Sequence, residues 1–157
     1  MNPLLRETLR SGTLASLAMM PFGMLFRVLD MRVGHYGREL LLVLTGPLPP
    51  PVFGGLSLLQ HFIIGWLSTW PLLLVMRWFG GAGRATHLLL GLAYGAGYYV
   101  VLNSWLLPLA FGDALPWTLG FATVLPSLVV HLVFGVCIGW TGFSYVRQSV
   151  RRTDVFA

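Results

Sequence analysis

Two nine-residue stretches of this chain place a histidine midway between a serine and a glycine. The first is 57–65, with His61 at its centre, and the second is 127–135, with His131 at its centre. Residues four apart lie on one face of a helix, so each stretch predicts a helix with one small and polar face. Imidazole nitrogens ligate haem iron and other metals, and they can exchange protons near neutral pH. His61 and His131 are therefore the first candidates for chemistry.

Three interpretations of this pair stay open. We expect the two helices to face each other, so both histidines could ligate one haem b iron, with the following glycines leaving room for the porphyrin. The pair could instead serve a metal or proton-handling site, although zinc usually takes three or four protein ligands. Further ligands for such a site, if the loop at 33–52 folds over the helices, are His35, Glu39, Asp30 and Asp113.

In the third interpretation the histidines are polar contacts between helices. They would bond to each other, to serine or Asn103, or to backbone carbonyls. In the first two interpretations the histidines share a site, which predicts that His61→Ala and His131→Ala cause similar defects.

Small residues along the predicted helices indicate close helix packing. Glycine and serine let two helix backbones approach each other, and a Gly-x-x-x-Gly pattern is typical of such contacts in membranes. The residues that we predict to form helix contacts are Ser57, Gly65, Gly91, Gly95, Ser127, Gly135 and Gly139.

The composition predicts an integral membrane protein. Of the 157 residues, 56% are hydrophobic and only 10% are charged, against roughly 25% charged residues in a soluble domain. A membrane-spanning helix needs about 20 apolar residues. Four such runs make up a single domain, at about 11–31, 53–76, 85–110 and 122–146.

Repetition of the serine–histidine–glycine motif in the second and fourth runs predicts how the runs are assembled. We expect an all-α, four-helix membrane bundle that is built as a tandem duplicated helical hairpin. The loop at 33–52 is expected to lie at the membrane surface or to dip into it, and its proline-rich end predicts an extended segment.

The charged residues predict orientation and local contacts. All ten basic residues are arginines, and with four spans most of them fall on the side of the two termini, which predicts cytoplasmic termini. The net charge of +5 indicates contact with anionic headgroups and not with nucleic acid. Arg27 and Asp30, three residues apart, predict an ion pair, and His87 is expected at the membrane interface.

The chain also resembles a known family. The His-x-x-Ile-Gly and His-x-x-Phe-Gly patterns at 61–65 and 131–135, with Leu-Pro-Trp at 115–117, are similar to small bacterial inner-membrane proteins of the YagU-like kind. The resemblance covers mainly the second run and 115–141. It implies a four-helix, multi-pass protein of the bacterial inner membrane, and it carries no activity with it.

Two classes of function follow from these observations. The sequence shows no Ser–His–Asp set and no paired carboxylates within a span, so we do not expect an enzyme. The first class is a non-catalytic accessory or structural subunit of a larger membrane complex, such as a respiratory one, with lipid and other membrane subunits or further copies of itself as partners. The second is a haem, metal or proton-handling protein centred on His61 and His131. A small transporter would require oligomerisation, because four spans enclose little volume.

Overall fold

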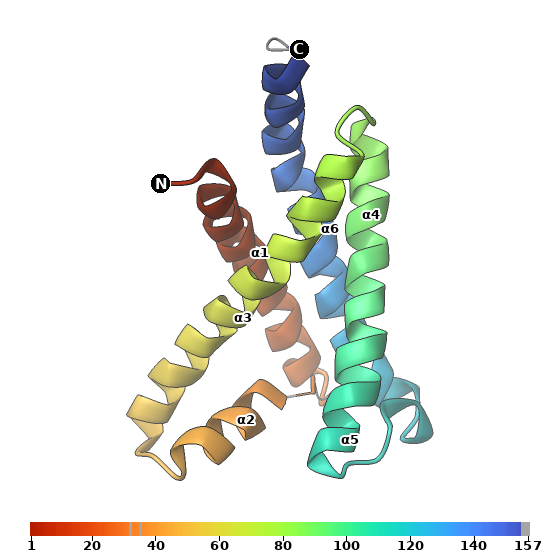
Figure 1. The fold of residues 1–157 in the computed structure, drawn as a ribbon. Helices are drawn as coiled ribbons and strands as arrows, with labels where there is room; N and C mark the ends of the chain where they lie inside the picture. The colour runs from red at the N-terminus through yellow and green to blue at the C-terminus, as the bar shows by residue number, and fades with distance from the viewer. Residues whose placement is uncertain (32, 35, 155–157) are drawn as a thin grey trace.

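The computed structural model describes residues 1–31, 33–34 and 36–154, and within them every regular element is helical, which confirms the all-α class. The elements are α1 (Pro3–Val28), α2 (Tyr36–Thr45), α3 (Pro50–Trp78), α4 (Arg84–Tyr98), the π-helical stretch η1 (Tyr99–Leu106), α5 (Leu107–Phe111), the 3₁₀ turn η2 (Pro116–Thr118) and α6 (Phe121–Asp154). Helices α4, η1 and α5 follow one another without a break and form one rod (Figure 1).

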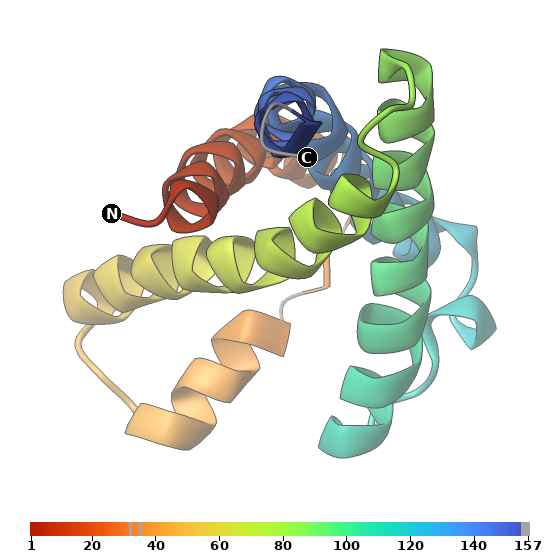
Figure 2. The same ribbon diagram turned by 45° about the horizontal axis from the view of Figure 1, so that its top comes forward.

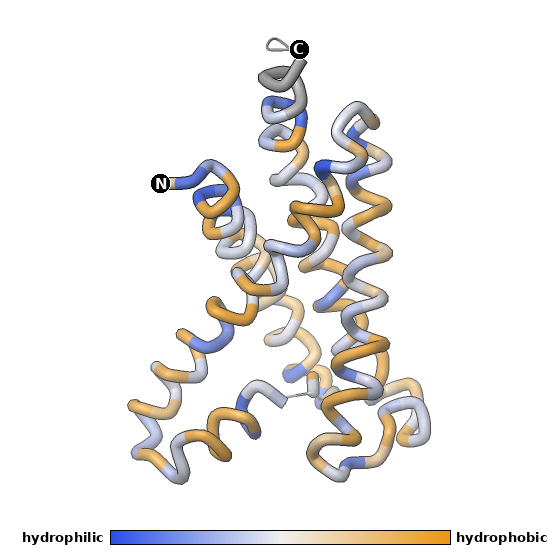
Figure 3. Tube along the Cα trace, viewed as in Figure 1, coloured by the Kyte–Doolittle hydropathy of each residue, from blue (hydrophilic) through white to orange (hydrophobic). Residues whose placement is uncertain are grey.

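Three helical stretches are long and apolar enough to cross a membrane. They are Pro50–Trp78, Arg84–Phe111 and Phe121–Ser149, and they contain the predicted runs 53–76, 85–110 and 122–146. Apolar residues dominate these helices in Figure 3, whereas polar residues gather at the beginning of α1 and toward the end of α6. Helix α1 has 26 residues but is not among the three stretches, because its serines, glycines and charged residues lower its mean hydropathy.

The long helices pack around α6. Helices α4 and α1 make the most extensive contacts with it, and α3 packs on both α1 and α6. The apolar core joins Leu72, Leu73 and Met76 of α3 to Phe134 and Ile138 of α6. This core lies toward the end of the molecule where α3 joins α4, called here the α3–α4 end. The opposite end, where α5 leads into α6, is the α5–α6 end (Figure 1).

The amino-terminal half of α3 diverges from α4 and α6 and runs beside α2, as both ribbon views show (Figures 1 and 2). All buried residues of α3 lie between Gly65 and Met76, and none lies in Pro50–Ile64. The first half of this membrane-length helix therefore has one exposed face, while its other face is partly covered by α2 and α1.

The segment after α1 differs from its prediction. Tyr36–Thr45 forms the short helix α2, and Pro50 and Pro51 begin α3 instead of extending a loop. Proline suits the first turn of a helix, because its missing N–H would have no partner there. The extended segment is thus restricted to the few residues around Gly46, whose φ of +67° is accessible to glycine.

The predicted ion pair between Arg27 and Asp30 is wrong. Helix α1 ends at Val28, and Asp30 has a left-handed φ of +55°. The two side chains therefore do not share a helix face. Arg32, which was counted in the predicted charge distribution, lies outside the described residues.

Candidate functional site

Four glycines bring α4 and α6 into backbone contact. A methyl group added at Gly135 would collide with the Gly91 carbonyl oxygen and lie 2.9 Å from its carbon, and one added at Gly95 would collide with the His131 carbonyl. Gly139 lies against His87 in the same way, with the carbonyl oxygen 2.5 Å from an added Cβ. Contacts this close require residues without a side chain, so these glycines set the separation of α4 and α6.

The motif on α3 contacts a different helix. The Ser16 hydroxyl of α1 fills the space beside Gly65, where an added Cβ would collide with it. A Cβ added at Gly12 of α1 would lie 2.9 Å from side-chain atoms of both Trp66 and Thr69. Each motif therefore faces the long helix that precedes it in the chain. The expectation that the two motif helices face each other through these surfaces is wrong, because α3 and α6 meet through large apolar side chains instead.

His131 is held by hydrogen bonds at both ring nitrogens. Its Nδ1 lies 2.6 Å from the Ser127 carbonyl oxygen, and its Nε2 lies 3.0 Å from the amide nitrogen of Asn103 in η1. A carbonyl can only accept, so Nδ1 carries a proton, and Nε2 accepts from the amide, which corresponds to the neutral ring. Tyr98 stacks on the ring with centroids 5.5 Å apart.

His61 lies in a different environment. Its Nε2 is 3.2 Å from the carbonyl oxygen of Ser16 in α1, whereas His131 contacts η1 and its own helix. Within the described residues the two histidines share no hydrogen-bond partner. A metal bound at the Nε2 atoms would have to displace both Asn103 and Ser16. The haem interpretation stays a prediction, and the geometry adds no support for it.

His87 is buried among the helices, in the first turn of α4, and its place at the membrane interface stays a prediction. Its side chain has no exposed surface, its Nδ1 donates to the Gly83 carbonyl 3.0 Å away, and its ring meets Phe143 edge-on. Its Nε2 has no hydrogen-bond partner in the described chain. The close approach of Gly139 to its backbone explains why the ring is enclosed by α6.

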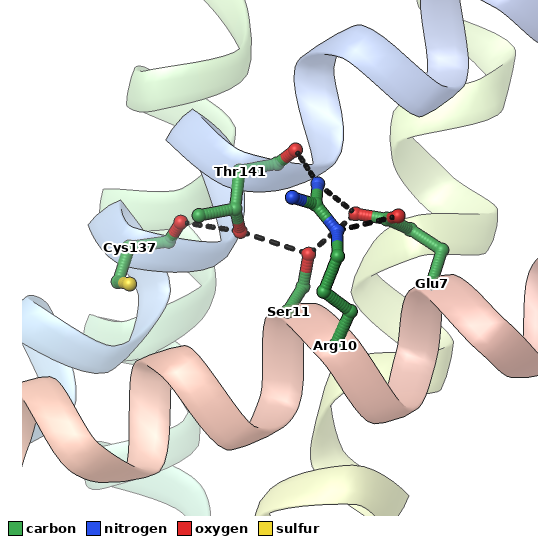
Figure 4. A network of polar contacts seen from close by, with 5 residues as sticks. All are labelled: Glu7, Arg10, Ser11, Cys137 and Thr141. Carbon is green, nitrogen blue, oxygen red and sulfur yellow. Dashed lines mark hydrogen bonds and ion pairs between the residues drawn. The ribbon is translucent and has the colours of Figure 1, made fainter.

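A buried carboxylate links α1 to α6 at the α3–α4 end (Figure 4). Glu7, only 6% exposed, accepts two hydrogen bonds from Arg10, at 2.8 and 3.0 Å, and one from Ser11 at 2.6 Å. Arg10 also donates to the backbone carbonyl of Thr141 in α6, and the Thr141 hydroxyl donates to the Ser11 hydroxyl. The hydrogen bonds to Glu7 raise the pKa of the Arg10 guanidinium. This network fastens α1 to α6.

Sequence inspection missed this network. The four-residue spacing of Glu7 and Ser11 indicates a shared helix face, but nothing local points to Thr141, which lies 130 residues further along the chain.

A small cavity of about 170 Å³ lies at the α5–α6 end, between the beginning of α2, η1 and the connection into α6. Tyr36 stacks on Phe111 with centroids 5.7 Å apart, and the Gly34 N–H donates to the Ser127 hydroxyl at 2.8 Å. Burial, reinforced by the Asp113 charge and a hydrogen bond to it, raises the pKa of Tyr36 to about 12. The polar side chains that line the cavity are Tyr36, Tyr99, Asn103, Asp113, Thr123 and Ser127.

The predicted additional metal ligands do not gather with the histidines. Asp30 follows α1, Glu39 lies on α2 and Asp113 lies before η2; His35 lies outside the described residues. In the described chain no three histidine, cysteine, aspartate or glutamate side chains come close enough to hold one metal ion. A protein zinc site needs at least three such ligands.

The seven predicted helix-contact residues divide into two groups. Gly65, Gly91, Gly95, Gly135 and Gly139 lie directly against a neighbouring helix. Ser127 anchors Gly34 through its hydroxyl, whereas the hydroxyl oxygen of Ser57 is buried without a hydrogen-bond partner in the described chain.

Comparison of the chain with protein-family models, with curated proteins and with solved structures finds no match.

Proposed function

We propose that this chain is a non-catalytic accessory subunit of a larger membrane complex, and that a partner docks on the amino-terminal half of α3. The observation that carries the proposal is the absence of any buried residue in Pro50–Ile64, although this segment belongs to a helix of membrane-spanning length. The carboxyl-terminal half of the same helix is packed against α1 and α6.

One polar side chain on this segment, Gln60, favours a protein partner over lipid alone. Ser57, Gln60 and His61 lie at positions that share one helix face. His61 bonds to Ser16, and the Ser57 hydroxyl oxygen is buried. Of the three, only the half-buried Gln60 is open to a partner, and its amide makes no hydrogen bond within the described chain. Gln60 lies about 15 Å along the helix from Pro50, at 1.5 Å per residue, which places it well inside a membrane span.

The chemistry of the partner follows from these side chains. Lipid tails can cover the exposed Leu58, Leu59 and Ile63, but they offer no hydrogen bond to an amide. Unpaired polar groups in hydrocarbon are costly, and hydrogen bonds across helices are worth about 0.6–2 kcal/mol there. A membrane helix that presents a hydroxyl, amide or other hydrogen-bonding side chain would satisfy Gln60.

Photo-cross-linking at Leu59 tests this proposal. A photoreactive amino acid there is compared with one at Leu89 of α4, since the two positions are similarly exposed, at 51% and 64%. We expect a discrete protein adduct from Leu59 and only lipid adducts from Leu89. Lipid adducts alone at both positions would contradict a docked partner. An adduct between two copies of the chain would show that the partner is a second copy, and would contradict docking on a different subunit.

We also propose that the chain is a four-helix membrane bundle of two tandem hairpins. The support is that Gly65 packs on α1 and Gly135 packs on α4, so each motif contacts the preceding long helix. The insertion of α2 between α1 and α3 distinguishes the first hairpin from the second, in which η2 alone separates α5 from α6.

The proposed location is the bacterial inner membrane, with both termini in the cytoplasm. The positive-inside rule supports this orientation, because arginines lie at the beginning of α1, the end of α3, the beginning of α4 and toward the end of α6, the parts of these helices at the α3–α4 end. They are Arg6, Arg10, Arg77, Arg84 and Arg147. With Cys137 replaced by alanine, single cysteines test the orientation. A membrane-impermeant maleimide should label Trp117→Cys in intact cells and Gly81→Cys only after permeabilisation, and the reverse pattern would invert the topology.

A further inference from the structure

We propose that the cavity at the α5–α6 end binds a small monovalent cation such as Na⁺. The cavity volume of about 170 Å³ is well above the roughly 10–15 Å³ that a site needs to hold one water. It can therefore accept an ion together with coordinating water. The larger part of its lining is apolar, but six polar side chains each contribute an oxygen atom, which is the ligand atom that hard cations prefer.

The first indication is a buried hydroxyl without a partner. Tyr99 is only 4% exposed and lines the cavity, yet its hydroxyl oxygen is buried and makes no hydrogen bond in the described chain. A buried polar group without a partner costs about 1–3 kcal/mol. Such a group calls for an explanation, and an ion or its water in the cavity supplies the missing partner.

The second indication is the charge of the lining. Among the described residues that line the cavity, Asp113 is the only acidic one and none is basic. The carboxylate disfavours an anion. Calcium sites usually combine several carboxylates, so a single carboxylate with neutral oxygens matches one positive charge. The neutral oxygens come from Tyr99, Asn103 and Ser127.

The third indication is that fixed contacts hold the lining in place. The Tyr36–Phe111 stack fastens α2 to α5, and the hydrogen bond from Gly34 to Ser127 fastens the segment before α2 to α6. Asn103 donates its amide hydrogen to His131, which leaves its carbonyl oxygen without another hydrogen bond in the described chain. The oxygens are thus positioned before an ion arrives, which reduces the entropic cost of binding.

The test is equilibrium binding of ²²Na⁺ to the full chain in mild detergent, with choline chloride keeping the ionic strength constant. We expect saturable binding to one site per chain. Asp113→Asn should weaken it about tenfold or more, because a charge-assisted contact is lost. Tyr99→Phe removes one neutral ligand and should weaken binding about threefold to tenfold.

Tyr145→Phe is the matched control, because Tyr145 lies toward the other end of α6 and does not line the cavity. Its binding should equal that of the wild type. Tyr99→Phe removes a hydroxyl that has no hydrogen-bond partner in the described chain. In choline this variant should therefore be at least as stable as the wild type, which separates loss of binding from loss of fold. Non-saturable binding, or binding that survives both Asp113→Asn and Tyr99→Phe, would overturn the proposal.

Discussion

Two glycines of α4 allow the helix contacts to be tested with one chemical change. Gly95 faces the backbone of α6, where an added Cβ would collide with the His131 carbonyl oxygen and lie 2.9 Å from its carbon. At Gly97, two residues further along the same helix, an added Cβ would have no neighbouring atom of the described chain within 4 Å. The substitutions Gly95→Ala and Gly97→Ala thus differ only in what the new methyl group meets.

The expected magnitudes follow from these distances. Carbon atoms pack best at about 3.5–4.0 Å, so the methyl group of Gly95→Ala requires α4 and α6 to separate by roughly 1 Å. Overpacking of this kind costs about 1–3 kcal/mol, and the upper part of that range applies because the obstructing atoms are backbone. At an open helix position such as Gly97, replacing glycine by alanine raises the free energy of unfolding by up to about 1 kcal/mol. The two variants should therefore differ by about 3 kcal/mol.

The measurement is the free energy of unfolding in mild detergent, titrated with SDS and followed by tryptophan fluorescence. Gly97→Ala should equal or exceed the wild type, and Gly95→Ala should fall clearly below it. Equal stability of the two variants would refute the backbone contact between α4 and α6.

Three further predictions follow from the polar side chains. Glu7→Ala removes the acceptor of three hydrogen bonds and should cost about 2 kcal/mol in the same unfolding assay; the cost stays moderate because Arg10 is half exposed. Glu7→Gln keeps an acceptor oxygen and should cost less, and equal losses would contradict the role of these hydrogen bonds. His131→Ala should destabilise more than His61→Ala, because His131 bonds through both nitrogens and His61 through one; equal defects would instead favour the shared site. Burial and Asp113 raise the pKa of Tyr36 from 10.0 to about 12, so the folded chain keeps a proton that the unfolded chain loses, and the stability contributed by Tyr36 should fall as the pH rises from about 10 to about 12. Tyr36→Phe should lose less stability over that interval, and an identical pH profile would contradict the shift.

Hydrophobic runs and four-residue spacings predicted the parts of this fold that depend on local sequence. The apolar runs located the three membrane-length stretches, because length and apolarity are read directly from the residues. The spacing of Gly91, Gly95, Gly135 and Gly139 indicated a contact face, and these glycines do lie at one.

The partners of these faces could not be predicted in the same way. A small-residue face permits close approach by any helix, so the repeated motif was compatible with mutual packing and with packing on the preceding helix. His87 shows the same difficulty, because nothing in its local sequence predicts its burial, which depends on Gly139 of α6. The cavity likewise depends on residues from distant segments, such as Tyr36 and Asn103.

Native gel electrophoresis of solubilised membranes tests the proposed role most directly. A tagged wild type is compared with Gln60→Leu and with Gln148→Leu, the control at an exposed position toward the carboxyl end of α6. The wild type and Gln148→Leu should migrate in an assembly well above the 17.3 kDa chain in its micelle. Loss of the Gln60 hydrogen bond should weaken that assembly about threefold to thirtyfold and release the free chain. Migration of all three as the free chain, or an assembly that Gln60→Leu leaves intact, would contradict docking on α3.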